Sequence, residues 1–200
     1  MVTLFKPGIR KILRVFYTRR NEKIHLRKLA RETKMQGQSI SRYLAQLEND
    51  KILASSREGN LKQYCLRSSR MVYAALSEFD VEKLEELPLL RKNAIYTYLK
   101  ALPQPPVFAI VFGSTAKETY TKDSDIDILL VTNSRIDDSL AEKEADAQCA
   151  MRVNSFQITY RQFIKELKMK EEPVIQAAIQ TGYPAINHVE YYQALNNERA

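Results

Sequence analysis

The sequence predicts an α+β protein, in which a basic helical N-terminal part precedes a small mixed sheet with helices. Short apolar runs typical of buried strands alternate with helical patterns over residues 107–160. The charge also divides sharply, because residues 1–70 hold 17 Lys/Arg and 5 Asp/Glu, whereas residues 71–200 hold 14 Lys/Arg and 19 Asp/Glu. A net charge of +12 followed by one of −5 indicates two domains, the first of which faces a polyanion.

Composition excludes several classes of protein. With 44% hydrophobic and 28% charged residues among 200, the chain can form an ordinary folded core, so disorder is excluded. Cys65 and Cys149 form neither a metal-binding spacing nor a disulfide framework, which fits a reducing compartment. No apolar stretch approaches the ~20 residues of a membrane span, and the N-terminus lacks the apolar core of a signal peptide. We therefore expect a cytoplasmic protein without membrane contact.

The segment 107–131 carries the motif on which the functional prediction depends. One apolar run ends at Gly113 and Ser114, and Asp125 and Asp127 open a second run. Glycine lets the backbone approach a phosphate closely, and the free N–H groups of a helix start favour anions. Two aspartates spaced two apart on a strand point to one face. Although each feature alone is compatible with an ordinary turn and solvated carboxylates, together they are suited to Mg²⁺ and a nucleoside triphosphate.

Gly113-Ser114, Ala116 and the run Asp123-Ser124-Asp125-Ile126-Asp127 together resemble the signature of the minimal nucleotidyltransferases, which are relatives of DNA polymerase β. This resemblance implies that Gly113 and Ser114 contact the triphosphate of ATP or another NTP. It also implies that Asp125 and Asp127 are catalytic residues and hold Mg²⁺. The resemblance covers residues 107–131 clearly and the rest of the C-terminal part weakly.

The sequence departs from that family at two positions. Glu118 stands where the family usually has glycine, so either the short helix runs further or Glu118 adopts a left-handed conformation that costs about 1 kcal/mol. Active relatives also supply a third carboxylate from a later strand, yet the strand expected at 152–160 has no Asp or Glu. Ser155 or Gln157 would take the inward position, and neither acts as a base at neutral pH. Asp146 is an example of a carboxylate that could replace the missing one.

Helical patterns and a hairpin signal fill the N-terminal part. Apolar residues at one-face spacing predict helices at residues 9–17, 26–33 and 38–49, with a tight turn at 35–37. The turn signal Glu58-Gly59-Asn60 separates candidate strands at 52–54 and 61–66. This order of elements resembles the winged helix domain found in many bacterial and archaeal transcription regulators.

The winged helix resemblance implies binding to double-stranded DNA, with the third helix in the major groove and the hairpin, or wing, along the backbone. The candidate DNA-binding residues lie on the early exposed turns of that helix and on the wing: Gln38, Ser39, Arg42, Arg57, Asn60 and Lys62. The alternatives are a solvated basic face and a winged helix that contacts only proteins. The net charge of this part makes the solvated basic face the less favoured alternative, because unpaired like charges destabilise a compact state.

Two further helical patterns connect the parts, at residues 71–87 and 89–102, with Asp80 as a possible restart of the first. We expect a winged helix domain at 1–67, a helical connector at 68–106 and a nucleotidyltransferase-like domain at 107–200. Apolar helices between two domains usually pack on one of them or pair with a second copy of the chain. Because winged helix regulators commonly bind as dimers, a homodimer through this connector is the favoured assembly.

These observations predict a DNA-binding transcription regulator whose nucleotidyltransferase domain binds Mg-NTP and could transfer a nucleotidyl group to a protein or small-molecule hydroxyl. The alternative is a non-catalytic regulator whose fold only senses a nucleotide or docks a partner. The missing third carboxylate favours the alternative, whereas the paired aspartates favour nucleotide binding in both. Since relatives of the domain act as antitoxins that nucleotidylate a paired toxin, a toxin-like protein partner is also expected.

Overall fold

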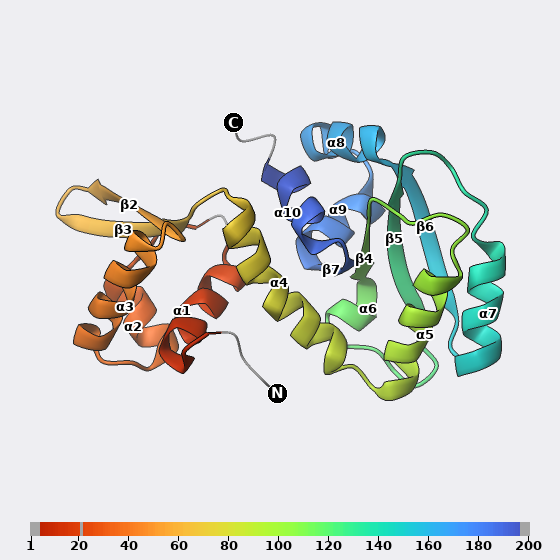
Figure 1. Ribbon diagram of the computed structural model, residues 1–200, viewed down its shortest axis with the longest axis horizontal. Coiled ribbons are helices and arrows are strands. Elements are labelled where there is room, and N and C mark those ends of the chain that lie inside the picture. Colours follow the sequence, from red (N-terminus) through yellow and green to blue (C-terminus); the bar gives the residue numbers. More distant parts are fainter. Residues whose placement is uncertain (1–4, 21, 197–200) are drawn as a thin grey trace. The chain divides into compact units, whose positions relative to one another are not determined.

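The chain divides into two compact units between Phe79 and Asp80, within the segment expected to be a connector. The computed structural model in Figure 1 describes residues 5–20 and 22–196, and each unit is considered by itself. Within these residues, none of the helices combines the length and the apolar character that a bilayer span requires. The sequence also predicts a polar helix over residues 188–200, and the last four of these positions lie outside the described residues.

The first unit has a helix-turn-helix followed by a hairpin. Its elements are α1 (Pro7–Thr18), β1 (Ile24–His25), α2 (Leu26–Thr33), α3 (Gly37–Asn49), β2 (Leu53–Glu58), β3 (Leu61–Leu66) and the start of α4 (Arg70–Glu85). The strands form an antiparallel sheet in the order β1-β3-β2. The helices predicted at residues 9–17, 26–33 and 38–49 are confirmed to within two residues at each end. This part of the chain therefore has the winged helix-turn-helix fold.

The helices of the first unit are held by the apolar stripes that predicted them. Ile12 and Phe16 of α1 and Ile40 and Leu44 of α3 are fully buried. Full burial of such a side chain contributes about 1.5–3 kcal/mol. The wing is longer than expected, because β2 continues through polar residues to Glu58, opposite Leu61. Backbone pairing with β3 sustains this polar half of the strand, which has no apolar alternation to predict it.

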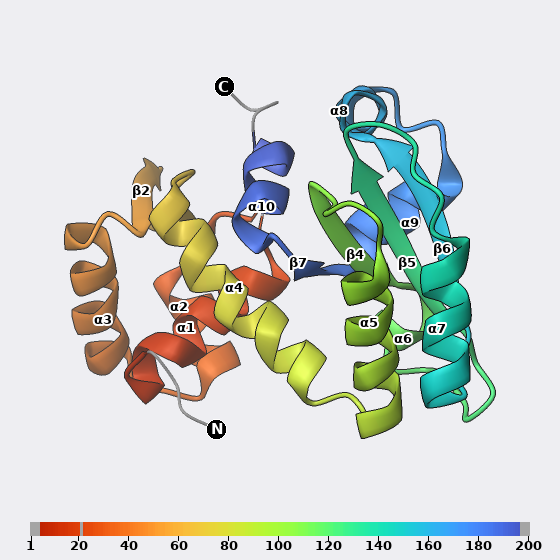
Figure 2. The same cartoon turned by 45° about the vertical axis from the view of Figure 1, so that its right-hand side comes forward.

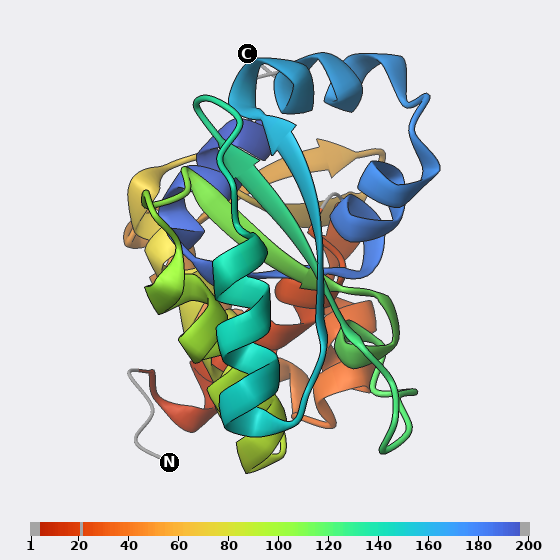
Figure 3. The same cartoon turned by 90° about the vertical axis from the view of Figure 1, so that its right-hand side faces the viewer.

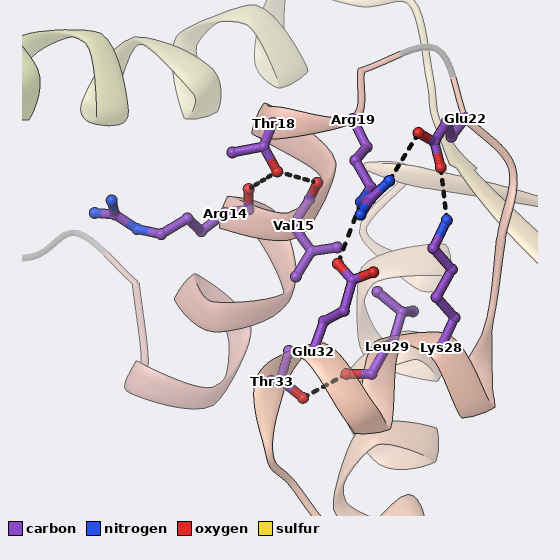
Figure 4. A network of polar contacts seen from close by, with 9 residues as sticks. All are labelled: Arg14, Val15, Thr18, Arg19, Glu22, Lys28, Leu29, Glu32 and Thr33. Atoms are coloured by element: carbon purple, nitrogen blue, oxygen red, sulfur yellow. Dashed lines mark hydrogen bonds and ion pairs between the residues drawn. The ribbon is translucent and has the colours of Figure 1, made fainter. Parts of the chain in front are cut away.

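Figure 4 shows how the end of α1 is tied to α2 by charged side chains. Arg19 contacts Glu22 at 3.0 Å and Glu32 at 3.3 Å, and Glu22 also accepts from Lys28 at 2.7 Å. Thr33 donates to the carbonyl of Leu29 at 2.7 Å inside α2. The charged groups are largely solvated, so we assign them a role in orienting the helices rather than in stability.

The second unit is a four-stranded mixed sheet with helices on both faces. After α4, its elements are α5 (Leu89–Ala101), β4 (Phe108–Phe112), α6 (Gly113–Ala116), β5 (Ile126–Thr132), α7 (Ser139–Cys149), β6 (Val153–Thr159), α8 (Tyr160–Met169), α9 (Pro173–Thr181), β7 (Tyr183–Ile186) and α10 (His188–Asn196). The strand order is β6-β5-β4-β7. Strand β4 is antiparallel to β5 and β7, whereas β5 and β6 are parallel.

The two faces of this sheet carry different chemistry. Figures 2 and 3 show α5 and α7 on one face and α8 and α9 on the other. Ile126, Ile128 and Leu130 of β5 belong to the core with α5 and α7. Since successive strand residues alternate, Asp127 and Leu129 point to the opposite face. On that face Phe108 packs edge-on against Phe163, Tyr160 and Tyr191.

In the second unit one expectation was wrong and one strand was missed. Asp80 does not restart a helix, because α4 is continuous from Arg70 to Glu85. Asp80 is fully buried and accepts a hydrogen bond from the hydroxyl of Tyr192 at 2.7 Å. The strand β7 was not expected at all, since it is short and includes Pro184, which usually argues against a strand. Its edge position beside β4 makes that proline tolerable.

Candidate functional site

The turn after β4 and Asp127 of β5 converge on one place. Phe112 is paired with Asp127, so Gly113 follows directly beside that carboxylate. Gly113 has φ +66°, and a Cβ on it would overlap the carboxylate oxygen of Asp127. Only glycine combines this left-handed backbone with so close an approach. The arrangement leaves the backbone of the turn and an acidic side chain facing the same small space.

The predicted phosphate and metal residues are all at least partly accessible. Asp125 is exposed immediately before β5, and Ser114, Asp127 and Gly113 are half-buried. The helix α6 that begins at Gly113 is only four residues long, so its dipole adds little. The case for a phosphate here therefore depends on the open backbone of the turn. The backbone of Arg152 lies next to this segment, because its carbonyl accepts a hydrogen bond from the N–H of Ile126, the residue after Asp125, at 2.9 Å.

Arg91 of α5 holds the loop that carries these residues, and sequence reasoning missed it. Its guanidinium donates to Thr115 Oγ1 at 2.9 Å and to the Ser124 carbonyl at 2.9 Å. It also reaches the carbonyls of Thr121 at 3.3 Å and Asp125 at 3.4 Å. One side chain thus joins the short helix after Gly113 to the residues that precede Asp127.

The environment of Arg91 is unusual for a charged group. The residue is 2% exposed, and its guanidinium lies 4.3 Å from the centre of the Tyr120 ring. Burial lowers the pKa of Arg91, against the raising effects of Tyr120 and Asp125. The one sequence signal was a charge on the buried side of α5, where Ala94, Ile95 and Tyr98 also lie. That signal identifies a buried arginine but not the carbonyls that it bonds.

The position beside Asp127 on the next strand is taken by Asn154. The parallel register pairs Asn154 with Asp127, and the Asn154 amide donates to Asp127 Oδ1 at 3.3 Å. The expectation that Ser155 or Gln157 points inward was wrong, because both lie on the opposite face. There Ser155 donates to Asp138 at 2.6 Å, and Gln157 bonds the backbone N–H and carbonyl of Ile136. The strand was located correctly, but its register differs by one residue, which exchanges its faces.

The structure also decides the conformation of Glu118 and the position of Asp146. Glu118 has φ +58°, so it adopts the left-handed conformation rather than extending α6. Asp146 lies on α7, which covers the face opposite Asp127. Among residues 5–20 and 22–196, no group of three or more His, Cys, Asp or Glu is arranged to hold a metal ion. The structure therefore brings the Asp127 carboxylate and the Asn154 amide together, and Asp125 lies two residues before Asp127.

A larger cavity, of about 870 Å³, lies elsewhere in this unit and is a weaker candidate. It is lined by Thr132 and Thr159, at the far ends of the strands from Asp127, together with Asp138 and Gln157. Several of its polar groups are already committed, since Asp138 accepts from Tyr98 and Ser155. Size alone does not make a site, so we place the chemistry at Gly113 and Asp127.

The candidate DNA-binding residues of α3 differ in exposure. Gln38 and Arg42 are exposed, whereas Ser39 is half-buried. The Arg42 guanidinium lies 5.3 Å from the centre of the Tyr43 ring on the same helix. Arg42 is thus the best presented of the three for contact with a base edge.

The wing residues are also unequal. Arg57 and Asn60 are exposed on the hairpin, but Lys62 pairs with Glu48 of α3 at 2.8 Å. Glu48 also accepts from Ser55 at 2.6 Å. The hydrogen bond from Lys62, followed by that from Ser55, lowers the pKa of Glu48, and the same pair raises the pKa of Lys62. Lys62 therefore fixes the wing to α3 as well as carrying charge.

Comparison with known proteins bears on both units. Residues 93–181 match the family model described as a nucleotidyltransferase domain, which includes Gly113, Asp127 and Asn154. This chain contains a nucleotidyltransferase domain. Its matched segment begins within α5, so the domain includes part of the helix that was expected to be a connector.

Among solved structures, the chain is similar to the crystal structure of MepR, a transcription regulator of the Staphylococcus aureus multidrug efflux pump MepA. The identity is 16%, over 48% of this chain and 76% of that chain, with a TM-score of 0.36. A similarity this low carries no argument. No curated protein matches the sequence. The assignment of a winged helix-turn-helix therefore depends on the helices and the hairpin of the first unit alone. The same chain carries the nucleotidyltransferase domain.

Proposed function

We propose that this chain is a DNA-binding transcription regulator whose nucleotidyltransferase domain binds Mg-NTP. The observation that supports it most is the contact of the Gly113 turn with the Asp127 side chain. A glycine forced against a carboxylate has no structural benefit for the sheet, but it brings an open backbone and an acidic group to one small space. ATP or another NTP is the ligand class that uses both.

The residues present fit a magnesium ion. Mg²⁺ in such sites is usually held by one or two carboxylates, with waters and substrate phosphates completing its coordination. Asp125 and Asp127 would hold it, while Gly113 and Ser114 bind the triphosphate. When bound, the ion neutralises and polarises the phosphates.

Of the two candidate functions, the site favours a regulator that binds a nucleotide without transferring it. Asn154 stands beside Asp127 where an active relative would have use for a carboxylate, and an amide cannot take up a proton at neutral pH. Nucleotidyl transfer is the second candidate, and the retention of both aspartates with Ser114 favours it. In that case the acceptor is a hydroxyl of a small molecule or of a toxin-like protein partner.

Labelled ATP separates the two candidates. The full chain would be incubated with ATP and Mg²⁺, with and without cell extract, beside Asp125→Asn. Label transferred by the wild type and not by the variant identifies an enzyme. Binding that requires Asp125, without transfer, identifies a sensor, and DNA affinity should then change when Mg-ATP is added. Absence of Mg-ATP binding to the wild type contradicts both candidates.

The proposed DNA-bound form is a homodimer. The charge of +12 in residues 1–70 supports a polyanionic partner. Two copies would read two half-sites of one operator, which is the common arrangement for helix-turn-helix proteins. Light scattering of the free chain and of its complex with a selected operator measures the number of copies. A monomer in both states would remove the dimer from the proposal.

A further inference from the structure

A cavity of about 470 Å³ lies on the same face of the sheet as Asp127. Leu129 of β5 and Phe156 of β6 form its floor, and helices α8 and α9 contribute Met169, Val174 and Ile175. Strand alternation puts Leu129 on the Asp127 side of β5 and Phe156 on the Asn154 side of β6. The cavity therefore lies on the sheet face that also carries the proposed phosphate site.

The separation of the two places suits one mononucleotide. Phe156 follows Asn154 by two residues, and Asn154 is paired with Asp127. With a rise of about 3.3 Å per residue, Phe156 lies roughly 7 Å along the sheet from the aspartate. A ribose connects a phosphate to a base over a comparable span. A nucleotide with its phosphates at Gly113 would thus direct its base toward Phe156.

Phe156 is presented as a fixed aromatic surface. It is 36% exposed, and its ring packs edge-on against Phe112 at 5.8 Å between centroids. Phe112 immediately precedes Gly113, so the same residue supports the phosphate turn and the ring. Met169 on α8 is 50% exposed and supplies a flexible apolar side chain to the same cavity. Aromatic and thioether groups of this kind suit a flat ring.

The charges around the cavity indicate which part of a nucleotide can enter. Lys165 is accompanied by Glu166, Glu171 and Glu172. Glu166 is 7% exposed and already accepts from Glu172 N at 2.8 Å and from Gln176 at 3.0 Å. An acidic surrounding repels a triphosphate but tolerates a neutral base, whose edge groups can bond to carboxylates.

We propose that this cavity is the nucleobase subsite of the NTP whose phosphates lie at Gly113 and Asp127. The inference rests on the proposed function, since it assumes a nucleotide at that turn. The base stacks on Phe156 and is covered by Met169. Stacking of this kind is insensitive to the identity of the base and adds affinity to a site otherwise built for phosphate.

A tryptophan in the cavity reports the base directly. The chain has no tryptophan, so Phe156→Trp introduces a single fluorophore. Mg-ATP should quench it, whereas Mg-tripolyphosphate, which has no base, should leave it unchanged. Leu140→Trp is the matched control, because Leu140 is 69% exposed on α7, across the sheet from the cavity, and should respond to neither ligand.

Calorimetry on the full chain gives the second measurement. Phe156→Ala should weaken Mg-ATP binding about tenfold and leave Mg-tripolyphosphate binding unchanged. Met169→Ala, a change on the other wall, should weaken Mg-ATP alone by a smaller factor. Asp127→Asn should weaken both ligands, because it acts on the phosphate end.

The outcomes distinguish a wrong nucleobase subsite from a wrong phosphate site. If the wild type binds Mg-ATP and Mg-tripolyphosphate equally, or both ligands quench equally, the base subsite is wrong and the phosphate site stands. If Phe156→Ala weakens both ligands alike, Phe156 only supports the turn and the subsite is again wrong. If the wild type binds neither ligand, the proposed nucleotide function fails, and the subsite fails with it.

Discussion

At the scale of single residues, Gly113 and Gly59 form a natural comparison. Both have left-handed backbones, with φ +66° and +57°. A Cβ on Gly59 would meet nothing within 4 Å, whereas one on Gly113 would overlap Asp127. Substitution of Gly59 therefore measures the free-energy cost of the left-handed backbone alone. Substitution of Gly113 adds the cost of the overlap with the Asp127 side chain.

We predict that Gly59→Ala costs about 1 kcal/mol of stability, as expected for left-handed strain alone. Gly113→Ala should cost at least about 2 kcal/mol, because the Asp127 side chain must also move, and it should abolish Mg-ATP binding. Urea unfolding and calorimetry measure the two effects. Equal costs and unchanged binding would show that Asp127 moves aside without consequence.

Glu118 has the same backbone conformation without being glycine. Glu118→Gly should stabilise the chain by up to about 1 kcal/mol, because it relieves the left-handed strain. Lys117→Gly is the matched control, since Lys117 is right-handed at φ −85° and should gain nothing. Urea unfolding distinguishes the two variants. A loss of stability in Glu118→Gly would mean that the side chain contributes more than the strain costs.

These residues also show what sequence could and could not predict. The left-handed conformation of Glu118 was one of two alternatives that the sequence left open, and the family resemblance led to the expectation that Gly113 and Asp127 belong to one site. The face of Asn154 did not follow, because a strand of mixed polar and apolar residues has no alternation to set its register. The register of β6 is set by its pairing with β5, which is a tertiary contact.

At the scale of elements, α5 controls the loop between α6 and β5 through Arg91. Arg91→Ala should destabilise the second unit by about 3 kcal/mol or more, since it leaves Thr115 Oγ1 and several carbonyls without their charged donor. Arg91→Lys should recover part of this loss, because one ammonium cannot reproduce the guanidinium fork. Urea unfolding provides the measurement.

The neighbouring Lys92 gives the control for Arg91. It pairs with Glu85 at 3.0 Å near the surface, so Lys92→Ala should cost less than about 1 kcal/mol. Similar costs for Arg91→Ala and Lys92→Ala would contradict the role of Arg91 in the loop. Helical periodicity predicted α5 itself, but no local pattern predicts which carbonyls an arginine reaches across 30 residues of sequence.

The wing should depend on acid through Glu48. Its pKa is lowered by Lys62 and Ser55, so its contribution to stability is present above its ordinary value of 4.5 and is lost as the pH falls below it. Because the Lys62 side chain is 44% exposed, the contribution stays below about 1 kcal/mol. The protection factors of the β2 and β3 amides, which correct each exchange rate for its intrinsic dependence on pH, should fall on acidification in the wild type and change less in Glu48→Gln. An equal fall in both would exclude Glu48 as the cause.

At the scale of the whole molecule, the uneven charge should appear in the salt dependence of DNA binding. Arg57→Ala should reduce the slope of log K against log salt by about 0.9, because an exposed phosphate contact is lost. Lys62→Ala should reduce it less, since Glu48 already neutralises Lys62 in the free protein. Equal slopes for the two variants would mean that DNA displaces Glu48 entirely.

Base reading should behave differently from phosphate contact. Arg42→Ala should weaken binding to the specific operator by about 1–3 kcal/mol and binding to unrelated DNA far less. Binding measured on both DNAs at one salt concentration tests this. An equal loss on both would make Arg42 a phosphate contact, and no loss would remove it from the interface.

The Asn154 amide has a consequence for how such proteins diverge. Asparagine and aspartate codons differ by one nucleotide, so a single point mutation at Asn154 would give the strand next to Asp127 an acid. Under the proposed function, that acid would supply the third carboxylate that active relatives use, so one substitution would separate nucleotide binding from nucleotidyl transfer without any change of fold.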